Sequence, residues 1–130
     1  MKQSELCIVD TSVFVDFFRG AEIPVFEKLV LENRILLSPF VKIELLVGVR
    51  KIEEGKLRHV LDGLIELVPD YNLFSAAEVI LAKMRGKGVS LGTVDLLIAA
   101  QANLGKFPLL SHDKVFQKIA ETKLIKLVSL

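Results

Sequence analysis

Cysteine, tryptophan and long apolar runs are scarce or absent in this chain of 130 residues. Its one cysteine, Cys7, cannot form a disulfide within the chain, and its place in an apolar run is typical of a core residue. No apolar run approaches the roughly 20 residues that a membrane-spanning helix needs. Glu5 and Asp10 interrupt the N-terminal segment, which therefore lacks the pattern of a signal peptide. These absences predict a soluble, intracellular protein of the cytoplasm with no membrane partner.

A strong net charge and the glycine motifs that bind nucleotides are also missing. The 17 basic and 16 acidic residues give a formal net charge of +1, so no overall basic field indicates nucleic acid, although clustered carboxylates would hide a local basic rim in this sum. Gly86-Lys87-Gly88 follows a helical segment and does not open a helix after a strand, so it is not a phosphate-binding loop. Asp10-Thr11-Ser12 lacks the second aspartate of haloacid-dehalogenase-type phosphatases, which counts against that class.

Apolar residues, in contrast, are abundant, at 52% of the chain. This fraction is on the rich side for a soluble domain. A chain of this length can bury a sizeable core, and we expect residues 1–130 to form one domain. The apolar surplus predicts a buried sheet together with an apolar surface that a partner covers.

Short apolar runs alternate with segments of helical spacing along the whole chain. Such alternation is typical of an α/β domain in which helices cover both faces of a parallel sheet. The apolar runs predict strands at residues 6–9, 35–37, 65–68, 107–110 and 124–128. The helical spacing predicts helices near residues 12–19, 24–33, 39–51, 57–64, 72–85, 93–104 and 113–120. The expected helix caps are Thr11 or Ser12, Ser38, and Ser90 or Thr93.

Two aspartates come directly after predicted strands. Asp10 follows residues 6–9, and Asp113 follows residues 107–110 in the segment Ser111-His112-Asp113. Open α/β sheets bind ligands beyond the carboxyl ends of their strands, so both aspartates lie where chemistry is expected. Each also has an ordinary structural role open to it, because aspartate commonly flanks or caps the start of a helix.

Two further acids lie among apolar residues on predicted helices. The residues three and four positions away are Phe40, Val41, Val47 and Gly48 for Glu44, and Leu91, Gly92, Ile98 and Ala99 for Asp95. An ionised carboxylate on a buried face is costly unless it is paired or bound to a metal ion. The alternative for each acid is an ion pair with a nearby lysine or arginine, or a place at the edge of the apolar stripe.

Together these four acids predict a metal site at one edge of the sheet. Converging carboxylates repel one another, so they require either protonation or a cation. Oxygen ligands without a histidine or cysteine cluster select a hard ion, Mg²⁺ or Mn²⁺. Such an ion attracts phosphate and can activate water toward a phosphodiester.

Four segments of the chain resemble those of PIN-domain ribonucleases, and most of all the VapC toxins of prokaryotic toxin–antitoxin pairs. The segments come in the order of that family and span nearly the whole chain. They are Ile8-Val9-Asp10-Thr11-Ser12, residues 44–49 (Glu44-Leu45-Leu46-Val47-Gly48-Val49), residues 95–102 from Asp95 to Ala102, and residues 110–116 from Leu110 to Phe116.

The resemblance implies a three-layer α/β/α fold with a central parallel sheet in the order 3-2-1-4-5, and an RNA endonuclease that depends on Mg²⁺ or Mn²⁺. It implies that the catalytic and metal-binding residues are Asp10, Glu44, Asp95 and Asp113. Thr11 and Ser111 match supporting hydroxyl positions beside the first and last acids. Asp16 matches a frequent aspartate of relatives that we interpret as structural. Val115 departs from the pattern, since many relatives have an acidic or polar residue there that could support a second ion.

The resemblance also implies a homodimer and a VapB-like antitoxin whose peptide covers a groove of the toxin. Basic residues that could line an RNA path, or simply be solvated, are Arg19, Lys42, Arg50, Lys51, Lys56, Arg58, His112 and Lys114. We exclude His112 from the catalytic residues, because alternation along the chain turns it away from Asp113. Two other functions stay open: a non-catalytic PIN-like module that binds proteins, and an RNA-processing nuclease without an antitoxin.

Overall fold

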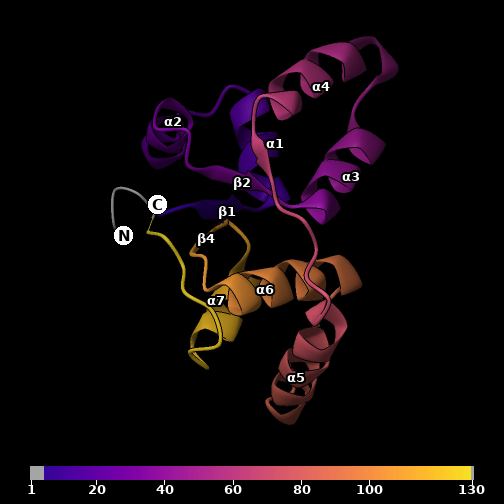
Figure 1. Cartoon of the computed structure of the whole chain (residues 1–130), viewed down its shortest axis with the longest axis vertical. Helices are drawn as coiled ribbons and strands as arrows, with labels where there is room; N and C mark the ends of the chain where they lie inside the picture. The colour runs from indigo at the N-terminus through magenta and orange to yellow at the C-terminus, as the bar shows by residue number, and fades with distance from the viewer. Residues whose placement is uncertain (1–4, 130) are drawn as a thin grey trace.

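A computed structural model describes residues 5–129 of the chain (Figure 1). The strands are β1 (Cys7–Val9), β2 (Ile35–Leu37), β3 (Ile65–Glu66) and β4 (Leu109–Leu110). The α-helices are α1 (Thr11–Phe18), α2 (Pro24–Leu31), α3 (Pro39–Gly48), α4 (Glu54–Asp62), α5 (Leu73–Gly86), α6 (Thr93–Gly105) and α7 (Lys114–Ala120), and a 3₁₀-helix, η1, spans Lys51–Glu53. Among these elements no helix is both long enough and apolar enough to span a bilayer.

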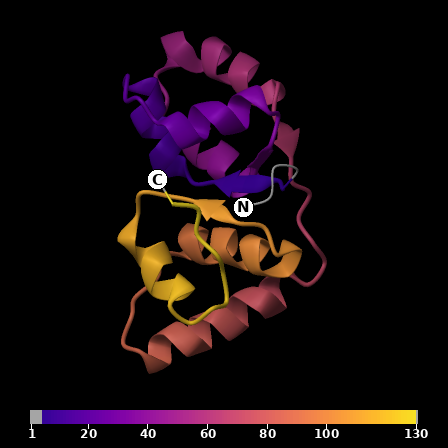
Figure 2. The same ribbon diagram turned by 90° about the vertical axis from the view of Figure 1, so that its left-hand side faces the viewer.

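The sheet is parallel, as expected, and its strands lie in the order β3-β2-β1-β4. Figures 1 and 2 show α1 to α4 on one face of the sheet and α5 to α7 on the other, which gives three layers. The expected fifth strand, 124–128, is reduced to a single parallel bridge between Leu127 and Leu109 of β4. The predicted order is therefore confirmed for four strands. The fifth place is marked only by this bridge, whose two backbone hydrogen bonds join Leu109 to Lys126 and Val128.

The central strands are buried because helices cover both of their faces. All three residues of β1 have no exposed surface, and Ile35 to Leu37 in β2 are nearly as buried. Strands that are buried on both faces consist of continuous apolar runs, and this explains why the sequence predicts β1 and β2 correctly. In contrast, β3 lies at the edge of the sheet, and both of its residues are exposed.

Two helix starts differ from the prediction because the hydroxyl groups expected as caps do not cap. Asp10 is the N-cap residue of α1, and Thr11 and Ser12 are already helical. Gly92 precedes α6, so neither Ser90 nor Thr93 caps that helix. In contrast, Ser38 caps α3 as predicted, since its hydroxyl accepts a hydrogen bond from the amide of Phe40. A hydroxyl at the start of a helix can instead donate to a side-chain acceptor. At α1 the hydroxyls of Thr11 and Ser12 donate to the carboxylates of Glu44 and Asp10.

Helix lengths differ most around residues 49–56. The helix predicted to reach Lys51 ends at Gly48, and α4 begins at Glu54, three residues before the predicted start. The polar segment at Glu53 and Glu54 is thus part of two helices and not a loop. This segment brings α4 back over α3, and the two helices border a groove described below.

Candidate active site

Asp10 lies at the carboxyl end of β1. This strand lies between β2 on one side and β4 on the other, and this position is the switch point where open α/β sheets bind ligands. The Asp10 side chain is only 4% exposed. The hydroxyls of Ser12 and Ser111 both donate to its Oδ2 atom, each at 2.8 Å. Two hydroxyls, one from the first turn of α1 and one from the segment that follows β4, therefore hold this buried carboxylate in place.

Glu44 reaches the same region from the middle of α3. The Thr11 hydroxyl, at the start of α1, donates to Glu44 Oε1 at 2.6 Å. Glu44 is partly buried, whereas Val47 and Gly48 on the same helix are exposed. The expected apolar stripe is therefore open to solvent at its C-terminal end, and Glu44 lies at its border.

Asp95 shows that the four acids share one electrostatic environment. It lies in the first turn of α6, and its pKa is raised from 3.8 to about 6. The largest cause is desolvation by burial, followed by the negative charges of Asp10, Asp113 and Glu44. Gly92 lies beside this carboxylate, since a Cβ atom there would be in ordinary van der Waals contact with Asp95 Oδ2, at 3.7 Å. The alternative of an ion pair with a lysine or arginine is not found for Asp95 among residues 5–129, and the charged groups that shift its pKa are acids.

Asp113 combines the structural role and the candidate site role that the sequence left open. Its Oδ1 accepts a hydrogen bond from the amide of Val115 at 3.0 Å, and this caps α7. Its own amide donates to the Ser111 hydroxyl oxygen at 2.9 Å. Ser111 therefore contacts both Asp10 and Asp113, so one hydroxyl links the first and last acids.

The donor set fits a hard divalent ion, although the side chains would have to move to bind it. Four carboxylates without a histidine or thiolate among them match the oxygen ligands of Mg²⁺ or Mn²⁺. The raised pKa of Asp95 indicates an excess of negative charge that a cation would neutralise. Within residues 5–129, no three His, Cys, Asp or Glu side chains are arranged to hold one ion as they stand. Binding would therefore draw the acids inward from their present positions.

Three contacts near the acids were not predicted from the sequence. Ser12 was expected only as a cap, but its hydroxyl binds Asp10, and its oxygen accepts the backbone amide of His112 at 3.1 Å. His112 also pairs through Nδ1 with Asp16 Oδ2 at 2.5 Å. Asp16 is therefore occupied by a partner on another element, and the His112 side chain faces α1. The residues are 96 positions apart, so no local pattern could have revealed the pair.

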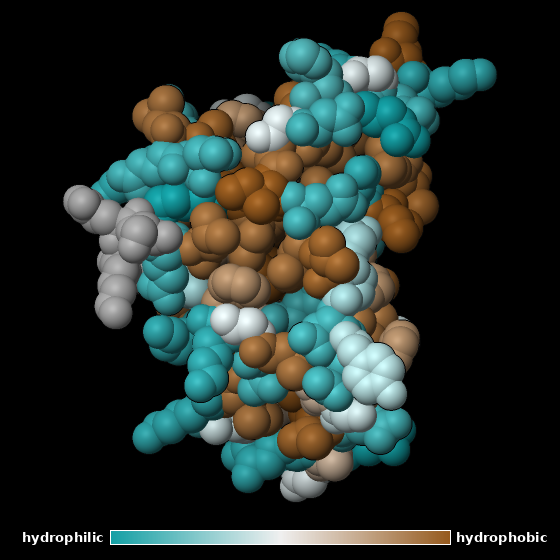
Figure 3. Space-filling view, in the orientation of Figure 1, coloured by the Kyte–Doolittle hydropathy of each residue, from teal (hydrophilic) through white to brown (hydrophobic). Residues whose placement is uncertain are grey.

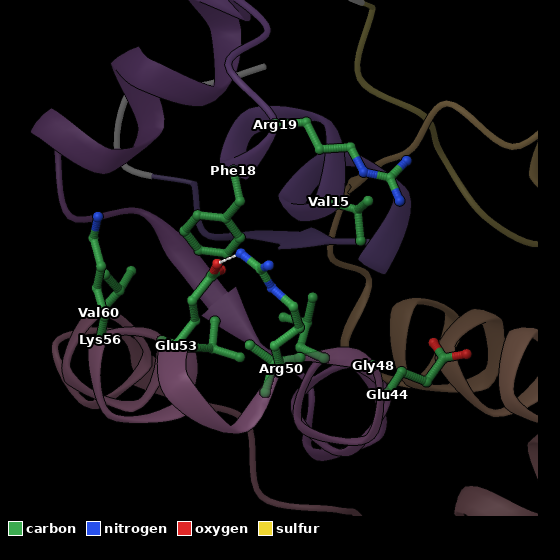
Figure 4. A pocket seen from close by; sticks show the side chains of 12 residues that line it. Val15, Phe18, Arg19, Glu44, Gly48, Arg50, Glu53, Lys56 and Val60 are labelled. Carbon is green, nitrogen blue, oxygen red and sulfur yellow. Dashed lines mark hydrogen bonds and ion pairs between the residues drawn. The ribbon is translucent and has the colours of Figure 1, made fainter.

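A groove of about 430 Å³ runs beside the acids, between α1 on one side and α3, η1 and α4 on the other. Figure 4 shows Phe18 and Arg19 at one wall, the ion pair of Arg50 and Glu53 at the opposite wall, and Glu44 at one end. The groove is lined by Val15, Phe18, Arg19, Glu44, Leu45, Gly48, Val49, Arg50, Glu53, Lys56, Leu57 and Val60. It combines an apolar floor with basic side chains and ends at one of the four acids.

Some of the basic residues considered for an RNA path line the groove, some form ion pairs, and Arg50 does both. Arg19, Arg50 and Lys56 line the groove. Lys42, Arg50 and Arg58 form ion pairs with Glu66, Glu53 and Glu54. For Lys42 and Arg58 the structural interpretation is therefore the better supported one.

Comparison with known proteins gives a consistent picture of the fold. The family model of the PIN domain matches residues 7–122. A chain in the crystal structure of VapBC2 from Rickettsia felis bound to a DNA fragment from their promoter superimposes with a TM-score of 0.80 and 22% identity, covering 95% of this chain and 97% of that one. The corresponding values for DNA-bound VapBC from Salmonella typhimurium are 0.79, 20%, 95% and 97%. For a toxin-antitoxin complex from Klebsiella pneumoniae they are 0.61, 23%, 83% and 87%. None of the curated proteins compared with the chain matches it.

The crowding of acids predicts that Asp95→Asn stabilises the metal-free protein. An unfolded aspartate has a pKa near 3.9, so the folded protein binds an extra proton between about pH 4 and 6. The stability of the wild type therefore falls as the pH rises through that range, and the asparagine variant lacks this loss. At pH 7.5 we expect the free energy of unfolding of the variant to be about 1–2 kcal/mol higher than that of the wild type, a figure that allows for solvent screening. The difference should shrink toward pH 4.

Urea denaturation at a series of pH values, with EDTA present, measures this difference. Asp62→Asn, at the exposed end of α4, is the matched control and should unfold like the wild type at every pH. A destabilised Asp95→Asn at pH 7.5 would contradict the repulsion argument.

Proposed function

The chain belongs to the PIN-domain family, and from this membership and the site geometry we propose that it is a metal-dependent endoribonuclease, the toxin of a VapBC-type toxin–antitoxin pair. PIN domains are generally nucleases, so the family supports phosphodiester hydrolysis. The observation that carries the proposal is the raised pKa of Asp95, which is caused first by burial and then by the charges of Asp10, Asp113 and Glu44. Repelling carboxylates at the ligand-binding edge of a sheet are costly, and a cation-dependent activity gives them a use.

In this proposal the four acids, Asp10, Glu44, Asp95 and Asp113, are catalytic residues and would hold Mg²⁺ or Mn²⁺. When bound, such an ion supplies the positive charge that stabilises a phosphodiester during hydrolysis and lowers the pKa of water. Thr11 orients Glu44, and Ser111 orients Asp10, through the hydrogen bonds described above. These hydroxyls fix carboxylates that would otherwise turn away from one another.

RNA is the proposed substrate, and the groove supplies basic side chains for its backbone. Arg19, Arg50 and Lys56 line the groove, which ends at Glu44. Lysine and arginine contacts to phosphate give affinity without reading sequence. We therefore propose that these residues contribute to binding the strand and leave the choice of cleavage site to other contacts.

The same groove is the proposed docking place of a VapB-like antitoxin. The structural relatives include VapBC complexes, in which a PIN-like fold occurs together with a partner protein. Phe18 is 44% exposed at the groove, and Val15, Leu45, Val49 and Leu57 supply further apolar surface. A groove with apolar lining is the kind of surface that an amphipathic peptide segment covers.

A homodimer, a single PIN domain over residues 1–130 and a cytoplasmic location complete the proposal. The structure leaves many large apolar side chains exposed, including Val47, Ile52, Val68, Tyr71 and Phe74. Figure 3 shows apolar surface, in brown, extending over much of the middle of one face. Exposed apolar patches mark contact sites, and we propose that a second copy covers part of them.

Sedimentation velocity at a protein concentration of tens of micromolar should then give the mass of a dimer. A monomer at that concentration would contradict the proposed homodimer.

The nuclease assignment predicts that Asp10→Asn and Asp95→Asn abolish Mn²⁺-dependent cleavage of a mixed RNA pool. Removal of one acid weakens the proposed ion site on which hydrolysis would depend, so we expect at least a hundredfold loss, on the order seen for essential catalytic groups. Circular dichroism should show an unchanged fold. Asp62→Asn is the control and should cleave like the wild type.

Two results would contradict the assignment in different ways. Cleavage retained by both variants would show that Asp10 and Asp95 are not catalytic residues. Failure of the wild type to cleave any RNA with Mg²⁺ or Mn²⁺ would favour the non-catalytic binding module instead.

The docking assignment predicts that Gly48→Phe weakens partner binding. Gly48 lines the groove, and a Cβ atom there meets nothing within 4 Å, so a larger side chain fills the groove without disturbing the fold. The partner to test is the product of a small open reading frame adjacent to the gene, co-expressed and co-purified with the chain. We expect at least a tenfold loss of affinity by titration calorimetry, the size of effect expected when a clash blocks an interface pocket.

Gly86→Phe is the matched control, because Gly86 also ends a helix and also faces open space. Equal affinity of both variants for the partner would contradict docking in the groove. The lack of any complex with the wild type would reject an antitoxin and leave an RNA-processing nuclease.

A further inference from the structure

We infer that His112 and Asp16 form a positioning pair that holds the loop 111–113, and with it Asp113, against α1. This inference rests on the proposed function for its catalytic consequence. It adds two residues that lie outside the set of four acids and their hydroxyl neighbours. The paired atoms are His112 Nδ1 and Asp16 Oδ2, at 2.5 Å, where the ring N–H donates to the carboxylate.

The loop 111–113 depends on tertiary contacts because β4, which leads into it, has only two residues. Its first contact is made by the Ser111 hydroxyl with Asp10 Oδ2. Its second is the backbone amide of His112, which donates to the Ser12 hydroxyl oxygen. Both of these contacts attach the loop to the N-terminal end of α1. The His112 side chain adds an attachment one turn further along the same helix.

The helix that receives these contacts is a firm support. Val13 and Phe14 of α1 have no exposed surface, and the Phe14 ring packs edge-on against Phe26 at a centroid distance of 5.5 Å. A loop attached at two successive turns of such a helix cannot pivot about a single point. The pair therefore restricts a rotation of the loop that the contacts with Asp10 and Ser12, both at the start of α1, would allow.

Asp113 is the residue that this restriction affects. It directly follows His112, its carboxylate caps α7 through Val115, and its amide donates to Ser111. The direction of its side chain is therefore set by the backbone of the loop. A loop that rotates would carry Asp113 away from Asp10 and Asp95, and misplacement of a catalytic group by about 1 Å is enough to lower a rate strongly.

The exposure of the pair separates a positioning role from a role in general stability. The side chains of His112 and Asp16 are 29% and 44% exposed, and exposed ion pairs contribute little to the free energy of folding. Removal of the pair should therefore leave the melting temperature nearly unchanged. Its effect should be confined to the loop and to the site that the loop completes.

The test uses the full chain with His112→Ala, Asp16→Ala and the double variant. Each single variant should lose on the order of tenfold in kcat for Mn²⁺-dependent RNA cleavage, with KM nearly unchanged. The double variant should lose no more than either single variant, because both remove the same contact. His112→Asn should recover most of the rate, since its amide nitrogen lies where Nδ1 does. His59→Ala, at the only other histidine, is the control and should behave like the wild type.

Hydrogen exchange of a peptide that covers residues 109–116, measured by mass spectrometry, supplies a readout besides activity. It should be faster in His112→Ala and Asp16→Ala than in the wild type, while peptides from α5 stay unchanged. Additive losses of kcat in the double variant would overturn the pair. An inactive His112→Asn together with a fully active Asp16→Ala would also overturn it, because this result would indicate that His112 acts on the substrate. If the wild type cleaves no RNA, the proposed function fails by itself. In that case unchanged exchange in both single variants would overturn the pair, and faster exchange would support it.

Discussion

Four carboxylates gather beyond the carboxyl end of β1, and their mutual repulsion has to be balanced by the rest of the fold. Asp10 is buried there, and the pKa of Asp95 is raised by burial and by the negative charges of the other three acids. Such a cluster opposes folding in the absence of a cation, because each ionised group disfavours its neighbours. The chain tolerates the cluster because a large apolar core, in which β1 itself is completely buried, supplies the stability.

Hydroxyl groups determine where these carboxylates point. Thr11, Ser12 and Ser111 each donate to an acid of the cluster, and Ser111 also accepts the amide of Asp113. Repelling carboxylates would turn outward if solvent alone solvated them. Hydrogen bonds to an ionised acceptor are stronger than those between neutral groups, so a few of them can hold a geometry that electrostatics opposes. These hydrogen bonds fix the direction of individual carboxylates, and the negative charge of the cluster stays without a counter-charge within residues 5–129.

The sequence was sufficient for the four strands of the sheet and for the acids that follow strands, because both depend on local pattern. Apolar runs such as residues 7–9 and 35–37 are buried on both faces, and a carboxylate directly after such a run lies at the edge of a parallel sheet. It was insufficient where a side chain chooses between a local and a distant partner. Thr11 and Ser12 have the composition of helix caps, but a carboxylate 33 residues away recruits the first. The predicted fifth strand, residues 124–128, is present only as a single bridge, because these residues lie at the edge of the sheet and pair only once with β4.

The groove and the acidic cluster are coupled through Glu44, which belongs to both. It lines the groove between α1 and α3, and it also contributes to the negative charge at Asp95. A peptide that fills the groove would therefore contact one of the proposed metal ligands and cover the basic side chains proposed for RNA. Under the proposed function, occupation of this groove would therefore exclude the strand and restrain one acid at the same time.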